Sequence, residues 1–103
     1  MTAWIGKSVI VRGDVISSED LTIDGHVEGK IEVGNHSLTI GASAEVTANL
    51  VAKRISISGA VTGNVTATER VELLPTGSID GDLASPKLAM ADGAVLQGKV
   101  TVP

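Results

Sequence analysis

The sequence predicts an all-β protein, a β-solenoid of about six coils with roughly 17 residues in each coil. Three observations predict this fold: a short apolar pattern recurs at a nearly fixed spacing, apolar and polar residues alternate within each repeat, and aromatic residues are almost absent. The chain has 103 residues, of which 43% are hydrophobic and 19% charged, as in a folded domain. With one Trp and no Tyr or Phe, its core must consist of small and branched aliphatic side chains.

Two patterns make up the repeat. The first, apolar-x-apolar, begins at residues 21, 38, 55, 71 and 88, in steps of 17, 17, 16 and 17. The second, apolar-x-small-x-apolar, begins at residues 27, 46, 61, 79 and 96. A local period of two indicates strands whose apolar residues face inward. The aligned repeats give four inward columns: Leu21, Leu38, Ile55, Val71, Leu88; Ile23, Ile40, Ile57, Leu73, Met90; Val27, Val46, Val61, Ile79, Leu96; and Ile31, Leu50, Val65, Leu83, Val100.

The N-terminal residues fit as a further, less regular repeat. Ala3, Trp4 and Ile5 align with the first two columns, and the stretch VRGDV at 11–15 aligns with the last two. Six coils at ~4.8 Å per coil predict a rod of roughly 29 Å. Glycines are expected where the chain turns with positive φ or packs closely, and they follow the second column (Gly25, Gly59, Gly77, Gly93) or separate the third from the fourth (Gly29, Gly63, Gly81, Gly98).

The two ends of such a rod are the candidate functional surfaces. A solenoid leaves an open strand edge and a slice of core at each end, and neither terminal stretch here offers a helix or polar tail as a cap. Identical chains can therefore continue the ladder from one rod to the next. The candidate polymer contacts are Leu96, Val100, Val102 and Ile5.

The chain resembles the bactofilins, a family of bacterial polymer-forming cytoskeletal proteins. The resemblance covers about residues 5–100 and is carried by SEDLTIDGHVEGKI at 18–31, LTIGASAEVTANLVAKRISISGAVTGNV at 38–65, VELLPTGSIDGDL at 71–83 and DGAVLQGKV at 92–100. It implies a single right-handed parallel β-helix domain over residues 1–103. It also implies nucleotide-independent assembly into non-polar filaments and a scaffold at the inner membrane that positions cell-envelope or cell-shape proteins, cell-wall enzymes among them. At the C-terminal contact, Leu96 stands where family members often carry an aromatic residue.

Catalytic and metal-binding chemistry is not expected. The chain has no cysteine, His26 and His36 lack metal-ligand spacing, and no serine has a placed histidine and aspartate. We therefore expect a non-enzymatic protein without cofactors. A net charge of −4 argues against general binding to nucleic acid. Two other classes stay open: a monomeric or small-oligomer binding module, and a left-handed hexapeptide-type transferase, whose step of six is broken at Leu38 and Ile40.

The N-terminus carries no signal peptide and the chain has no apolar stretch of about 18 residues, so we expect the bacterial cytoplasm, with peripheral association at the inner membrane left open. Residues 1–10 are either a loose terminal segment or a contact surface. An outward Trp4 near Lys7 predicts a membrane or polymer contact. The alternative is that Trp4 folds over the first coil as a plug.

A basic stripe is expected on the outward row that precedes the first column. Arg54, Arg70 and Lys87 follow one another along this row, after Asp20 and Ser37. Three stacked cations can meet lipid headgroups or an acidic partner. Against this function, Glu69 and Glu72 lie alongside and predict a neutralised, solvated face.

Overall fold

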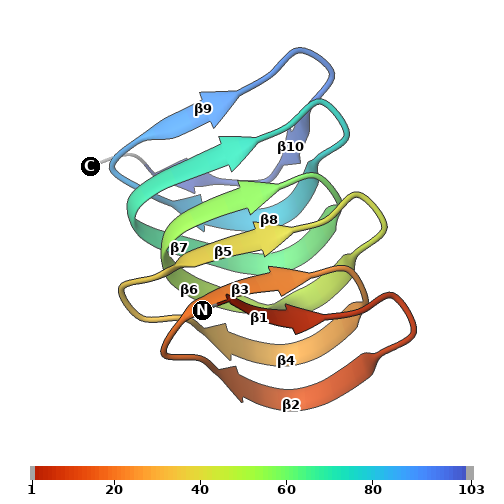
Figure 1. Ribbon diagram of the computed structural model, residues 1–103. Coiled ribbons are helices and arrows are strands. Elements are labelled where there is room, and N and C mark those ends of the chain that lie inside the picture. Colours follow the sequence, from red (N-terminus) through yellow and green to blue (C-terminus); the bar gives the residue numbers. More distant parts are fainter. Residues whose placement is uncertain (1, 102–103) are drawn as a thin grey trace.

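The computed structural model describes residues 2–101, and this part of the chain consists of strands and connecting turns with no helix. Figure 1 shows the strands winding around a rod from the N-terminal to the C-terminal end. Their bounds are β1 (Thr2–Ile5), β2 (Ile10–Ile16), β3 (Asp20–Ile23), β4 (His26–Glu32), β5 (Ser37–Ile40), β6 (Glu45–Ile57), β7 (Ala60–Leu73), β8 (Ser78–Ala84), β9 (Leu88–Met90), β10 (Val95–Gln97) and β11 (Val100–Thr101).

Each coil stacks on the preceding one through parallel strand pairs. On one side of the rod, β1 pairs with β3 and β3 with β5, while on the other side β2 pairs with β4 and β4 with β6. Strands β6 and β7 are long because each begins in one coil and ends in the next. The result is a β-solenoid of about six turns, as the sequence predicted, and its longest dimension is 30 Å.

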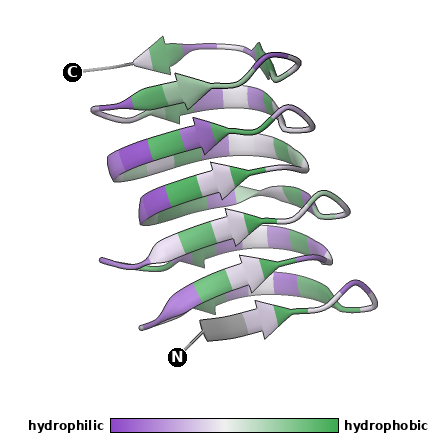
Figure 2. Ribbon diagram, turned by 45° about the horizontal axis from the view of Figure 1, so that its top comes forward, coloured by the Kyte–Doolittle hydropathy of each residue, from purple (hydrophilic) through white to green (hydrophobic). Residues whose placement is uncertain are grey.

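The strand register reproduces the predicted columns. Val27 pairs with Val11 below it and Val46 above it, and the other columns align in the same way. The less regular N-terminal repeat also has the predicted alignment, because Trp4 pairs with Thr22 and occupies an outward position. Figure 2 shows hydrophobic bands of successive coils lying over one another, with polar bands between them.

The columns are buried in the middle of the rod and less covered in the sixth coil, as expected of an end without a cap. Every column member in the second to fifth coils is buried. In the sixth coil, Leu88 and Leu96 are only half-buried, and Met90 and Val100 are exposed by 46% and 37%. The reason is that no further coil of the described chain covers β9, β10 and β11.

The core also contains inward positions that the four columns omit. One such position lies two residues beyond the fourth column. It is occupied in successive coils by the buried residues Val33, Ala52, Ala67 and Ser85. The buried Ser85 hydroxyl donates to the Lys87 carbonyl at 2.6 Å, so it carries no unsatisfied polar group into the core. A thin core without aromatic rings is thus filled by small residues at its corners.

Gly59 and Gly81, one from each predicted set of glycines, meet different physical requirements. Gly59, after the second column, is buried with ordinary φ, and a Cβ there would collide with the backbone carbonyls of Gly41 and Ala44 in the coil below. Gly81, between the third and fourth columns, has φ of 136°, which other residues rarely adopt. Close packing is therefore the requirement at Gly59, and backbone conformation is an added requirement at Gly81.

Candidate functional site: the two ends of the rod

The N-terminal end is an open strand edge. Within the described chain, β1 pairs only with β3 and β2 pairs only with β4. Trp4, Ile10 and Ile16 are exposed by 69%, 66% and 78%. Behind them, Ile5 is half-buried and packs against the core. This end therefore presents both unpaired backbone groups and apolar side chains.

Trp4 is attached to the second coil. Its indole Nε1 donates to Asp24 Oδ2 at 2.6 Å, and Asp24 follows β3 directly. The ring borders an open hollow of about 480 Å³ that Ile5, Val15 and Ile16 also line. Lys7 is exposed in the turn between β1 and β2. The two residues predicted as a membrane or polymer contact thus lie at the same end, Trp4 within β1 and Lys7 in the turn that follows it.

The C-terminal end is the second open edge. Strand β9 pairs only with β7, while β10 and β11 pair only with β8, within residues 2–101. Leu96 pairs with Ile79 and Val100 with Leu83, so both continue the core columns to the last coil. Exposed Met90 and Val95 lie beside them. Val102, the remaining predicted contact, lies outside the described residues.

Exposed apolar side chains gather at these two ends. Among the described residues, the large exposed ones in the first coil are Trp4, Val9, Ile10 and Ile16, and those in the last coil are Met90, Val95 and Val100. Leu74, in the turn after β7, is the one large exposed hydrophobic that the described chain places outside the terminal coils. Apolar surface concentrated in this way is typical of contact sites.

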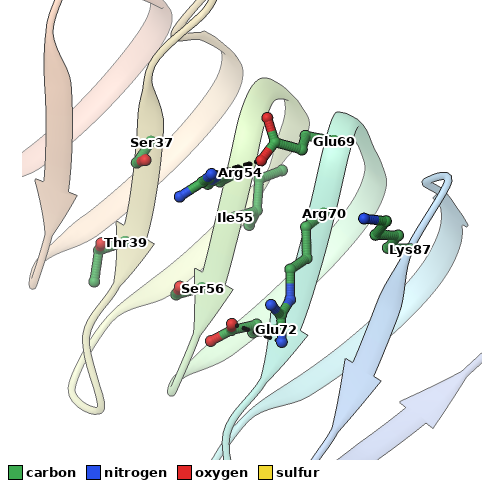
Figure 3. Close-up of a pocket in the computed structure, with 9 residues that line it drawn as sticks. All are labelled: Ser37, Thr39, Arg54, Ile55, Ser56, Glu69, Arg70, Glu72 and Lys87. Atoms are coloured by element: carbon green, nitrogen blue, oxygen red, sulfur yellow. Dashed lines mark hydrogen bonds and ion pairs between the residues drawn. The ribbon is translucent and has the colours of Figure 1, made fainter.

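The basic stripe lies on the side of the rod and lines a groove of about 520 Å³ (Figure 3). Arg54 and Arg70 are direct neighbours in the strand register, and the Lys87 carbonyl accepts a hydrogen bond from the residue after Arg70. Arg54 is held by Glu69, with Nη2 at 2.6 Å and Nε at 2.7 Å from Oε1. Arg70 Nη2 lies 3.1 Å from Glu72 Oε1.

These ion pairs neutralise most of the stripe. The hydrogen bond from Arg54 is the main reason that the pKa of Glu69 lies below its ordinary value, so this carboxylate stays charged at neutral pH. Lys53 Nζ lies 3.5 Å from the other Glu69 oxygen. Among the described residues, Lys87 is the stripe cation without a carboxylate at ion-pair distance.

The histidines lie on the surface of the rod. His26 is half-buried between Glu28, at 3.2 Å, and Glu45, at 3.5 Å. His36 Nδ1 lies 3.8 Å from Asp20 Oδ1. Within residues 2–101, no group of three or more His, Cys, Asp or Glu side chains is placed to hold a metal ion. The same residues contain no helix long and apolar enough to cross a membrane.

Comparison with known proteins gives consistent matches. A family model named Bactofilin and described as polymer-forming cytoskeletal matches residues 3–101. BacP and BacO of Myxococcus xanthus strain DK1622 are each 38% identical over 96 residues, which is 93% of this chain. The chain spans 40% of BacP and 75% of BacO.

A solved structure matches as well. It is a cryo-EM reconstruction of Thermus thermophilus bactofilin double helical filaments, with a TM-score of 0.86 and 30% sequence identity. The alignment covers 95% of this chain and 98% of that one. The solenoid described above is therefore the fold of a filament-forming relative over nearly its whole length.

Proposed function

This chain belongs to the bactofilin family of polymer-forming cytoskeletal proteins, and on that premise we propose that its two open ends join identical chains into filaments without nucleotide. It is a structural protein and not an enzyme. The observation that supports the assembly mode is the confinement of exposed apolar side chains to the terminal coils, with one exception among the described residues. The driving force would be apolar burial together with pairing of strand edges, neither of which needs a bound ligand.

The proposed contact residues within the described chain are the terminal members of the core columns. Leu96 and Val100 form the C-terminal contact with Val102, and Ile5 belongs to the N-terminal one. In a filament, each would gain the covering neighbour that its counterparts in the middle of the rod already have.

Electron microscopy and pelleting of the purified chain without nucleotide test this function. We expect filaments for the parent protein and none for Leu96→Asp, because the carboxylate would be buried without a partner in the contact. Leu74→Asp is the control, since it adds the same charge at an exposed leucine that lies outside the two terminal coils. A monodisperse monomer of the parent protein across salt and pH would contradict the proposal.

We also propose that the filament acts as a scaffold at the inner membrane and positions cell-envelope or cell-shape proteins. Trp4 and Lys7 are the residues proposed to reach lipid, because an exposed indole and a lysine suit the membrane interface. Co-sedimentation with vesicles that contain anionic lipid tests this role. Trp4→Glu should reduce binding, and unchanged binding and sedimentation would remove Trp4 from both the membrane contact and the polymer contact.

The basic stripe is proposed to be mainly a solvated face. Two of its three cations already have carboxylate partners, which leaves Lys87 to attract an anionic surface. Lys87→Glu should therefore leave vesicle binding nearly unchanged. A large loss of binding would instead identify the stripe as the contact to lipid headgroups or to an acidic partner.

A further inference from the structure

One side of the rod carries a row of exposed polar side chains whose charges are arranged symmetrically about its middle. The row occupies the outward position directly before the fourth column, once in each coil. From the first coil to the sixth, its members are Asp14, Lys30, Asn49, Asn64, Asp82 and Lys99, and all six are exposed. In the reverse direction, from the sixth coil to the first, the row has the opposite charge at every charged position.

A second outward row lies beside the first, two residues farther along each strand, because successive side chains of a strand point to opposite sides. Its members, in the same order of coils, are Ile16, Glu32, Val51, Thr66, Ala84 and Thr101. We call the two rows together the lateral face. It has two open hollows, one of about 160 Å³ beside Asp14 and Lys30 and one of about 250 Å³ beside Asp82 and Lys99.

From this arrangement we propose that two rods lie side by side and antiparallel, with their lateral faces in contact. The two-fold axis runs along the strand direction, between the third and fourth coils, so the first coil of each rod faces the sixth coil of the other. Asp14 then faces Lys99, and Lys30 faces Asp82. Each pair occurs twice, as in any isologous contact. The proposal goes beyond the proposed function, which concerns the ends of the rod and assigns no role to this side.

The charges of the lateral face suit a second copy of the same chain. All four charged residues of the first row meet an opposite charge, and complementarity of this kind specifies which surfaces pair. The second row adds one charge, Glu32, which already has a partner, because Lys30 Nζ lies 2.8 Å from its Oε1. An ammonium group has three donors, so Lys30 can keep this bond and bind Asp82 of the second copy as well.

The middle of the lateral face can be buried at low cost. In the proposed contact Asn49 faces Asn64, and beside them Val51 faces Thr66. Burial of a charge without a partner is costly, whereas a side-chain amide both donates and accepts and can be satisfied by a second amide. The uncharged residues therefore lie where the two rods would approach around the axis, and the charged ones lie toward both ends of the contact.

Other side-by-side arrangements match less well. If the same faces met with the rods parallel, each coil would face its own counterpart, and Asp14, Asp82 and Lys99 would face the uncharged residues of the second row. The neighbouring outward row, directly after the third column, lacks the symmetry. Antiparallel contact along that row would place Glu28 on Asp80, which is a pair of like charges. The antiparallel contact of the lateral face avoids both defects.

Cysteine cross-linking tests the orientation of the two rods. The chain has no cysteine, so an introduced thiol can form a disulfide only with another introduced thiol. We expect a mixed disulfide when Glu32→Cys and Ala84→Cys are combined and oxidised with diamide, because these positions face each other. Neither variant alone should form dimers, since equal positions lie three coils apart, ~14 Å, which is beyond the reach of a disulfide.

The outcomes separate this inference from the proposed function. One rod offers a narrow contact made of exposed ion pairs, each of which contributes little, but the contact would repeat along two filaments and its effect would add up. Filaments of the parent protein without a mixed disulfide, or disulfides within each single variant instead, would overturn this inference alone. A mixed disulfide in a protein that forms no filaments would overturn the proposed function alone.

Charge exchange in both cysteine variants tests the register. Asp82→Lys places a lysine opposite Lys30 twice, and we expect the yield of mixed disulfide to fall about fivefold or more. The double change Lys30→Asp/Asp82→Lys restores both pairs and should restore the yield. Asp80→Lys is the matched control, because it makes the same change at an exposed residue on the other side of Gly81, and it should keep the yield of the parent pair. A double change as weak as the single one would overturn the register.

Discussion

The middle coils and the terminal coils of this rod are built from the same apolar pattern, yet they present it differently. Ile31, in the second coil, is fully buried between two neighbours, whereas its counterpart Val100, in the last coil, is 37% exposed. Their local sequences, VEGKI and LQGKV, are closely alike. What differs is the number of strands beside them. The same residues thus serve as a core in the middle of the rod and as a candidate contact surface at its ends.

The sharpest way to test this contrast is to shorten equivalent side chains in both regions. Ile57→Ala should lower the free energy of unfolding by about 2–5 kcal/mol, because it removes a fully buried side chain and leaves a cavity. Met90→Ala, in the same column but 46% exposed, should cost less than about 1 kcal/mol.

Urea unfolding followed by circular dichroism measures both changes. The comparison belongs in the Leu96→Asp background, because this variant is expected to form no filaments that would add to the stability. Equal losses at the two positions would mean that the last coil is as well covered as the middle of the rod.

A second comparison uses two glycines that lie between the third and fourth columns, one in the fifth coil and one in the first. Gly81→Ala and Gly13→Ala both force alanine into positive φ, of 136° and 119°, which costs about 1–3 kcal/mol. At Gly81 the new Cβ would also collide with the Gly63 backbone of the coil below, while at Gly13 nothing lies within 4 Å. We therefore expect Gly81→Ala to lower Tm more than Gly13→Ala. The reverse order would show that coil-to-coil contact is not what requires glycine at this corner.

The smallest expected effect concerns the ion pairs on the side of the rod. Because Arg54 lowers the folded-state pKa of Glu69, the pair stabilises the fold above the unfolded-state pKa of about 4.3, and this contribution is lost as the pH falls through the folded-state value. Glu69→Gln should therefore be slightly less stable than the parent at pH 7 and equal to it at strongly acidic pH. Thermal unfolding at both pH values measures the difference, and a difference that grows toward acid would have the wrong sign.

Most of the fold could be predicted from the sequence. Aliphatic residues at every second position, in a pattern that recurs about every 17 residues, are compatible with few folds other than a β-solenoid. The register of all four columns was predicted, as were the Trp4 position and the placement of Glu69 and Glu72 beside the stripe. The row with Ala52, Ala67 and Ser85 was missed because small residues occur inside and outside a fold alike.

The candidate site was less predictable than the fold. That Leu96 and Val100 end their columns follows from the repeat, but their partial exposure depends on the missing neighbour and not on their own residue type. The bond from Trp4 to Asp24 joins residues 20 positions apart and depends on side-chain reach, which spacing alone does not give.

The position of Trp4 allows intrinsic tryptophan fluorescence to report on the N-terminal end of the rod. It is the sole tryptophan and there is no tyrosine, so intrinsic fluorescence arises from the N-terminal end of the rod alone. An indole that is 69% exposed emits from an aqueous environment, and its emission shifts to shorter wavelength when another molecule covers it. Joining at the N-terminal end can therefore be followed by fluorescence without a label, while contacts at the C-terminal end leave the signal unchanged.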